Sequence, residues 1–140
     1  GEGEQIETVL RFVNVNASWS TYVGPQYGRH KAAYFKLAAC QIMPGAVGLA
    51  ALDSLALRTP LLTRDLPSHG PEIDYLEHGV NGIVTGSSEE AYCDGVTDYL
   101  LDPACQQRLR DGCAKTCDRY TIEQMADRFA QGVMAALQTT

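Results

Sequence analysis

The spacing of apolar residues predicts that helices and short buried strands alternate along most of the chain. The i, i+3, i+4, i+7 spacing of one helix face predicts a helix over residues 4–13, through Ile6, Val9, Leu10 and Val13. Comparable patterns predict further helices over residues 29–39, 47–57 and 71–78. Short apolar runs bounded by Gly or Pro predict four strands, over residues 21–23, 41–43, 60–63 and 82–84.

After Gly86 the pattern becomes wholly helical. Three helix starts are marked by capping signals, namely the capping boxes Ser87/Glu90 and Thr121/Gln124 and the N-cap and first helical position Asp102-Pro103. The last helix carries a continuous apolar face made of Ile122, Met125, Phe129, Val133 and Leu137.

Short strands that alternate with helices are typical of parallel strands joined by right-handed crossovers. The sequence therefore predicts a doubly wound, Rossmann-like α/β sheet. Four strands are few for this architecture, because parallel strands covered on both faces need neighbours. We expect the sheet to lack members and residues 1–140 to form part of one domain that is incomplete at its N-terminus.

The composition of the chain limits which classes of binding partner and which cellular compartment we expect for it. The chain has 140 residues, 45% of them hydrophobic and 20% charged, which suits one folded domain. Its net charge of −6 argues against a nucleic-acid surface, which needs a basic field. No apolar stretch approaches the ~20 residues of a transmembrane helix, and no basic segment followed by an apolar run opens the chain as in a signal peptide. We expect a cytoplasmic location.

Five cysteines cannot all pair with one another. Cys105, Cys113 and Cys117 resemble a metal-binding set, but with Leu109 they recur every four residues and form one stripe on a helix. Neither a Cys-x-x-Cys pair nor a pair of histidines accompanies them. Buried, reduced thiols are therefore favoured over a metal site, and no metal is expected.

Ligands of open parallel sheets bind beyond the carboxyl ends of the strands. In this chain those points fall at residues 23–25, 44–48, 64–71 and 85–88. The second is the most informative, because Gly45 and Gly48 lack Cβ atoms and precede a helix N-terminus whose free N–H groups suit a phosphate. A tight structural turn is the alternative interpretation.

Other polar residues near these points allow two interpretations each. Asp53 lies among apolar neighbours, where it either accepts hydrogen bonds from a ribose diol or belongs to an exposed stripe. His69 either contacts a sugar or phosphate oxygen, or caps the next helix or faces water. Arg64 either neutralises a phosphate or is a solvated charge, and Glu72 suits the first turn of a helix whatever its function.

Several segments, in order, resemble the C-terminal, donor-binding domain of GT-B glycosyltransferases, in particular the retaining enzymes of family 4. The segments are AYFKLAACQIMP, PGAVGLAALDSLALRTPLLT, PEIDYLEHGVNGIV, SSEEAYCDGVTDYLLDPACQQRL and YTIEQMADRFAQGV. Each is weakly specific alone, and the resemblance spans roughly residues 20–135.

The resemblance implies a UDP- or GDP-linked sugar as substrate, with no metal and no further cofactor. It implies that the donor diphosphate lies on the turn made of Gly45, Ala46, Val47, Gly48 and Leu49. It places Asp53 on the ribose, the loop with Gly24 and Pro25 beside the base, and His69 and Arg64 near the sugar or phosphates.

The chain departs from the family pattern at one position. Where the family has two glutamates separated by seven residues, this sequence has Gly45 and Asp53, so the first carboxylate is missing. The basic pair that the family sets against the phosphates and the acceptor-binding N-terminal domain have no counterpart before residue 20. The catalytic residues are therefore not identified, and we expect little or no turnover from this chain alone.

The expected function is that of the donor-binding half of a retaining glycosyltransferase in glycan biosynthesis. The acceptor, a glycan, a lipid-linked sugar or a small molecule, would bind to the missing domain. The alternatives are a non-catalytic nucleotide-binding or scaffolding domain derived from such an enzyme, and a GT-B epimerase. The sequence leaves open whether the full-length protein is peripheral to a membrane.

Overall fold

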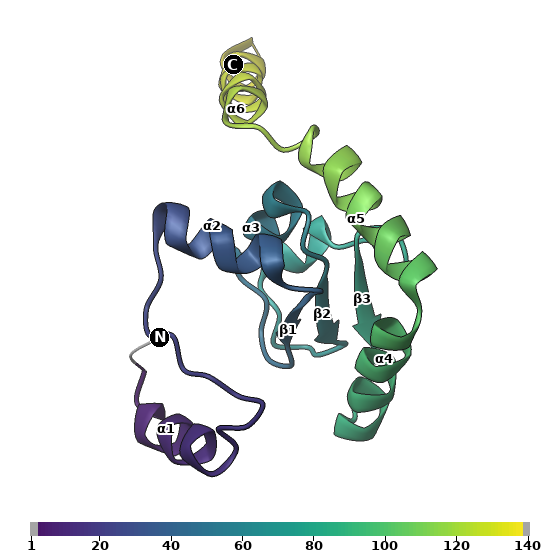
Figure 1. The fold of residues 1–140 in the computed structure, drawn as a ribbon. Helices are drawn as coiled ribbons and strands as arrows, with labels where there is room; N and C mark the ends of the chain where they lie inside the picture. Colours follow the sequence, from purple (N-terminus) through teal and green to yellow (C-terminus); the bar gives the residue numbers. More distant parts are fainter. Residues whose placement is uncertain (1–2, 139–140) are drawn as a thin grey trace. The chain divides into compact units, whose positions relative to one another are not determined.

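The computed structural model describes residues 3–138, and the chain divides into two compact units at residues 34 and 35 (Figure 1). The first unit contains α1 (Ile6–Val15), an irregular segment and the beginning of α2 (Gly28–Leu37). The predicted helix over residues 4–13 is confirmed with a shift of two residues, and Trp19 packs edge-to-face on Phe12, with ring centroids 5.6 Å apart.

The predicted strand over residues 21–23 is wrong, because these residues have no regular secondary structure. A three-residue strand is not stable without a partner, and the described part of the first unit contains no other strand. Gly24 follows with φ +68°, which ends any extended conformation at this point.

The second unit is an α/β domain built on three parallel strands. The strands β1 (Gln41–Met43), β2 (Leu61–Arg64) and β3 (Gly82–Thr85) lie side by side in the order β1-β2-β3 and point the same way (Figure 1). The prediction of parallel strands is confirmed for three of the four strands. A doubly wound sheet is defined by a point at which the strand order reverses. The strands of residues 3–138 follow their order in the sequence, so this sheet contains no such point.

Helices follow each strand. They are α3 (Ala50–Leu57), the 3₁₀ helix η1 (Pro71–Tyr75), α4 (Glu89–Leu101), α5 (Pro103–Cys117) and α6 (Ile122–Gln138). The third predicted helix begins later than expected, because residues 44–49 form the turn, and the fourth is a short 3₁₀ helix because Leu76 is already extended. None of the helices in residues 3–138 has the length and apolar character that crossing a lipid bilayer requires.

The two faces of the sheet are covered by different helices. Successive side chains of a strand point to opposite faces. Leu61 packs beneath α3 with Val47 and Ala51, whereas Leu62 packs with Tyr99 and other side chains from α4 and α5 on the opposite face. β2 is therefore buried on both sides. β1 forms an edge of the sheet, where Ile42 is 60% exposed.

Two of the three predicted helix starts are confirmed at the predicted N-cap. The Asp102 carboxylate accepts from the Cys105 N–H at 2.9 Å, and the Thr121 hydroxyl accepts from the Gln124 N–H at 3.2 Å. The first capping box is wrong by one residue, since Ser88 and not Ser87 caps α4. Ser88 has the extended backbone that an N-cap requires.

The helical prediction for α6 is also confirmed, but its apolar face stays exposed. α6 buries none of its described residues, and the side chains of the face are between 44% and 75% exposed, namely Ile122, Met125, Phe129, Val133 and Leu137. This face therefore contributes nothing to the core of the second unit.

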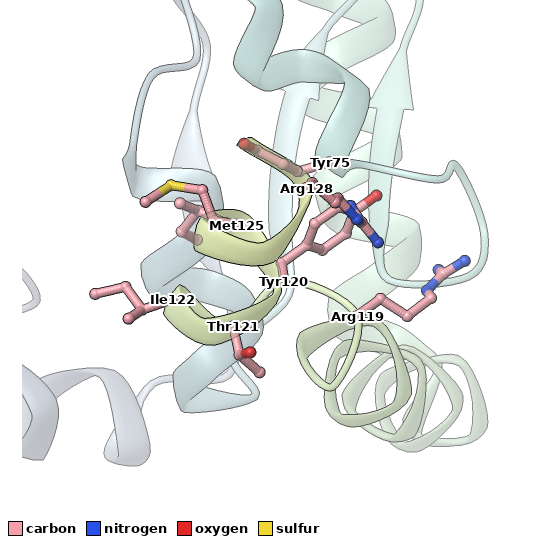
Figure 2. Close-up of a pocket in the computed structure, with 8 residues that line it drawn as sticks. Tyr75, Arg119, Tyr120, Thr121, Ile122, Met125 and Arg128 are labelled. Carbon is pink, nitrogen blue, oxygen red and sulfur yellow. The ribbon is translucent and has the colours of Figure 1, made fainter. Parts of the chain in front are cut away.

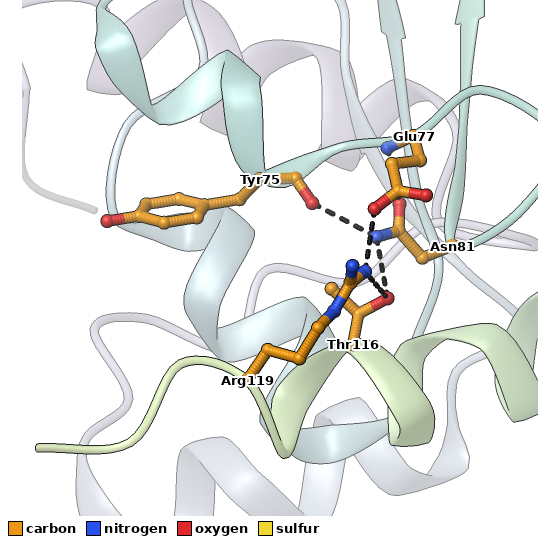
Figure 3. A network of polar contacts seen from close by, with 5 residues as sticks. All are labelled: Tyr75, Glu77, Asn81, Thr116 and Arg119. Atoms are coloured by element: carbon orange, nitrogen blue, oxygen red, sulfur yellow. Dashed lines mark hydrogen bonds and ion pairs between the residues drawn. The ribbon is translucent and has the colours of Figure 1, made fainter. Parts of the chain in front are cut away.

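A buried amide joins α5 to the sheet (Figure 3). The side-chain amide nitrogen of Asn81 donates to the Tyr75 carbonyl at 3.0 Å and to the Thr116 hydroxyl at 3.2 Å, and its oxygen accepts from the Glu77 N–H at 2.8 Å. Arg119 extends this network, because it pairs with Glu77 at 2.6 Å and also donates to Thr116. Asn81 is fully buried, so these bonds replace the water that its amide loses on folding.

The same contact requires a glycine in α5. A Cβ atom on Gly112 would lie 1.8 Å from the Val80 carbonyl oxygen and 2.7 Å from its carbonyl carbon. Both are backbone atoms, so no side-chain rotation relieves the overlap. α5 therefore packs directly on the backbone that leads into β3.

We predict that Gly112→Ala lowers the free energy of unfolding by more than ~2 kcal/mol, because α5 must move away from Val80 and from Asn81. Urea unfolding followed by circular dichroism measures this change. The matched control is Gly132→Ala in α6, where a Cβ atom meets nothing within 4 Å and helix propensity improves by ~0.5–1 kcal/mol. Equal stability of the two variants would contradict the close approach at Gly112.

Candidate functional site

The carboxyl ends of the three strands bring three of the predicted loops to one edge of the sheet. Because the strands are parallel and in register, Met43 lies beside Thr63, which lies beside Val84. The turn at residues 44–49, the loop at residues 65–70 and the loop at residues 86–88 therefore leave the sheet at the same edge. The fourth predicted loop, with Gly24 and Pro25, belongs to the first unit.

His69 holds the glycine turn against the loop after β2. The Val47 N–H donates to its Nδ1 at 3.1 Å, so Nδ1 is unprotonated and the ring is the neutral tautomer with its proton on Nε2. Nε2 then donates to the Arg64 carbonyl at 2.6 Å. The imidazole neither caps η1 nor faces water through its nitrogens. While both bonds are formed, neither nitrogen can reach a sugar or phosphate.

The two glycines of the turn have no packing or conformational requirement. Neither Gly45 nor Gly48 has a positive φ, and a Cβ atom on either would meet nothing within 4 Å. Two other glycines of the second unit are required by their surroundings, since Gly79 has φ +75° and Gly82 lies against the Leu61 carbonyl. The space beside Gly45 and Gly48 is open.

The N-terminus of α3 carries no side-chain cap. Leu49 occupies the N-cap position with helical dihedral angles and is 68% exposed. The first N–H groups of a helix have no partners within it. Here the Val47 N–H is already bound by His69, so the donors at this end without a partner among residues 3–138 are those of Gly48, Leu49 and Ala50. Of the predicted phosphate-binding residues, Val47 thus has a structural contact, and its side chain is buried in the core.

The Arg64 side chain bonds to the loops that follow β1 and β3. Its Nε donates to the Pro44 carbonyl at 2.8 Å and its Nη1 to the Ser87 carbonyl at 3.4 Å. Its Nη2 has no acceptor among the described residues, and the side chain is partly exposed. The guanidinium is therefore a fixed positive charge at the edge with donor capacity left over.

The two carboxylates near the turn lie in first helical turns. Asp53 is in the first turn of α3, is partly buried and is already engaged within the protein. Glu72 is in the first turn of η1, and its Oε2 atom lies so close to Gly70 that a Cβ atom there would come within 2.5 Å of it. Both positions suit the helix dipole, with or without a ligand.

Two threonines that the sequence did not single out also link the strand ends. The Thr63 hydroxyl donates to the Gly45 carbonyl at 3.4 Å, and the Thr85 hydroxyl donates to the Thr63 carbonyl at 3.3 Å. Thr63 is fully buried. Thr63 ends the strand predicted over residues 60–63, and a hydroxyl at that position was the sequence signal available for this role.

The cysteine stripe of α5 is part of the core. Cys105 and Cys113 are buried with Leu109, and Cys117 is half-buried. The Cys113 thiol donates to the Asn81 carbonyl at 3.1 Å, and burial raises its pKa to about 11. All five thiols are free, and no cluster of three His, Cys, Asp or Glu side chains within residues 3–138 could hold a metal ion.

Comparison with known proteins does not place the chain in a family. No protein-family model matches it, and no curated protein matches it either. The chemical role of the sheet edge is therefore inferred from the geometry of its residues and not from a matching protein.

We predict that His69→Ala frees the glycine turn without unfolding the domain. Loss of the bond to Nδ1 removes the protection of the Val47 amide, so its hydrogen exchange should accelerate about tenfold or more. Exchange followed by two-dimensional NMR measures this rate. His30→Ala, at an exposed position in α2, is the control and should leave the Val47 rate unchanged. An unchanged rate in His69→Ala would contradict the tautomer and the contact.

Proposed function

We propose that the edge formed by the glycine turn, Arg64 and the N-terminus of α3 binds the diphosphate of a nucleotide-sugar, and that the chain is the donor-binding part of a retaining glycosyltransferase. The observation that carries the proposal is that Gly45 and Gly48 are not required by packing or by a positive φ. The fold does not need these two glycines before the start of a helix. A ligand that approaches the backbone closely would explain them.

The groups at this edge have the chemistry of a diphosphate site. The N–H groups of Gly48, Leu49 and Ala50 are donors at the positive end of the α3 dipole. Arg64 adds a guanidinium that is held by two backbone carbonyls, so little side-chain entropy is lost when it binds an anion. This set can bind a phosphate locally although the chain as a whole carries a net charge of −6.

Asp53 is the candidate for the ribose. It lies on α3, one helical turn after the N-terminal donors, and a carboxylate there can accept hydrogen bonds from both hydroxyls of a diol. The resemblance to the GT-B donor-binding domain assigns the same role to this position. The parallel sheet, with its ligand edge at the carboxyl ends of the strands, supports a Rossmann-like assignment.

Catalysis would require groups beyond this chain. In retaining glycosyl transfer, charge develops on the leaving diphosphate, and cations stabilise it in the transition state. Arg64 supplies one cation, and no group that would hold an acceptor is identified among residues 3–138. We therefore propose that the chain binds the donor but does not turn it over alone.

A non-catalytic nucleotide-binding domain is the second candidate, and Gly45 favours it. At the position where the family pattern has a glutamate beside the donor sugar, Gly45 offers no side chain. A domain that holds the nucleotide without placing the sugar would need only the turn, Arg64 and Asp53.

The first test is whether Gly48→Ala weakens nucleotide binding while leaving stability intact. A Cβ atom on residue 48 meets no protein atom within 4 Å, so the free energy of unfolding should not fall. The same atom occupies the space that a phosphate would use. Titration calorimetry with UDP, GDP and ADP should show weak binding to the wild-type chain and about tenfold weaker binding, or more, to the variant.

Two results would contradict the proposal. One is the absence of binding heat with all three nucleotides in a folded sample. The other is unchanged binding in Gly48→Ala together with loss of stability, which would show that Gly48 serves a tight structural turn.

A separate test concerns the ribose. Asp53→Ala should weaken binding of the nucleoside diphosphates about tenfold, because hydrogen bonds to a charged acceptor contribute ~1.5–3 kcal/mol. Asp94→Ala, an exposed aspartate of α4, is the control with the same change of charge. Equal losses in both variants would contradict a contact between Asp53 and the ribose, and circular dichroism verifies that both variants are folded.

A further inference from the structure

A cavity of about 310 Å³ lies in the second unit, away from the residues assigned to the phosphates. It opens where α3, the end of η1 and the junction between α5 and α6 meet (Figure 2). Its walls include Leu52 of α3, Tyr75 of η1, Tyr120 of the junction and Met125 of α6. The volume is within the range of pockets that bind small molecules.

Two arginines and no carboxylate line this cavity, in a chain of net charge −6. Arg119 is committed to the protein, since it pairs with Glu77 at 2.6 Å and donates to the Thr116 hydroxyl at 3.3 Å. Arg128 forms no hydrogen bond or ion pair with any residue in the described part of the chain. Its guanidinium is therefore available to an anion.

The rest of the wall is aromatic and apolar. The rings of Tyr75 and Tyr120 meet edge-to-face, with centroids 4.8 Å apart and an interplanar angle of 73°. In the view of Figure 2, Met125 and Ile122 lie to the left of Tyr120, the guanidinium group of Arg119 lies to its right, and that of Arg128 overlaps its ring. The cavity thus has a cationic side and an apolar side that share one aromatic ring.

A ligand that satisfies both sides combines one anionic group with a small ring. Aromatic rings pack on tyrosine and methionine side chains, and a guanidinium binds a carboxylate or a phosphate through paired N–H groups. A long polyanion is not favoured, because Arg119 is already neutralised by Glu77 and one cation remains.

We propose that this cavity is a second ligand site, which binds a small aromatic anion with its carboxylate or phosphate on Arg128 and its ring against Tyr120 and Met125. The site is independent of the proposed diphosphate site, since the lining contains none of the residues at the sheet edge.

The test on the full chain uses three probes that each carry one phenyl ring, namely phenyl phosphate, phenylacetate and the uncharged benzyl alcohol. Two-dimensional NMR titrations should shift the amide signals of Tyr120, Thr121 and Met125 with the two anions. Benzyl alcohol should bind at least about tenfold more weakly, because it has no charge for Arg128. The comparison of the two anions tells a phosphate site from a carboxylate site.

Arg128→Gln should reduce the affinity for the anions to that for benzyl alcohol. Arg29→Gln makes the same change of charge at an exposed residue of α2 that does not line the cavity, and it should change nothing. Gly48→Ala should also leave this binding intact, so failure of the diphosphate site and failure of this site are distinguishable.

Three outcomes would overturn the proposal. They are equal affinity for the charged and uncharged probes, equal losses in Arg128→Gln and Arg29→Gln, and amide shifts confined to residues outside the cavity. Any of them would mean that the cavity does not recognise an aromatic anion.

Discussion

The packing of α5 on the backbone that leads into β3 is the constraint on which the second unit depends. Gly112 allows α5 to touch the Val80 carbonyl, and the buried amide of Asn81 then bonds to both the helix and the end of η1. Removal of the Asn81 amide would leave buried polar groups without this partner, which costs more than the contact itself contributes. β3 begins next to this contact and pairs with β2, so the three strand ends meet at one edge, which makes a ligand site possible.

Hydrogen bonds from side chains to the backbone hold the loops at that edge together. They thereby fix which backbone N–H groups a ligand can contact. His69 binds the turn before α3, and Arg64 binds the loops on both sides of its own strand. These bonds are short-range and directional, so they fix the positions of backbone N–H groups better than a surface ion pair would. The free donors at the start of α3 are therefore held ready before a phosphate arrives, which is the condition for binding an anion with backbone atoms.

The two proposed sites both bind an anion to a negatively charged chain, and they do so with different groups. A chain of net charge −6 repels anions at a distance, so any anion site must supply its own local positive potential. The sheet edge uses a helix N-terminus with Arg64, and the cavity uses Arg128 beside the Tyr75 and Tyr120 rings. The first suits a diphosphate, whose charge spreads over several donors, and the second suits a single anionic group on a ring.

The sequence by itself determined the features that depend on neighbours along the chain. These are the helical periodicity, the capping roles of Asp102 and Thr121, and the stripe that buries Cys105 and Cys113. Tertiary structure alone decided the features that need a partner far along the chain. Residues 21–23 formed no strand because they found no neighbour, and the tautomer of His69 followed from its contact with the Val47 N–H, 22 residues away, together with the Arg64 carbonyl. Local spacing encodes a helix face, whereas strand pairing and hydrogen-bond partners exist only once the chain has folded.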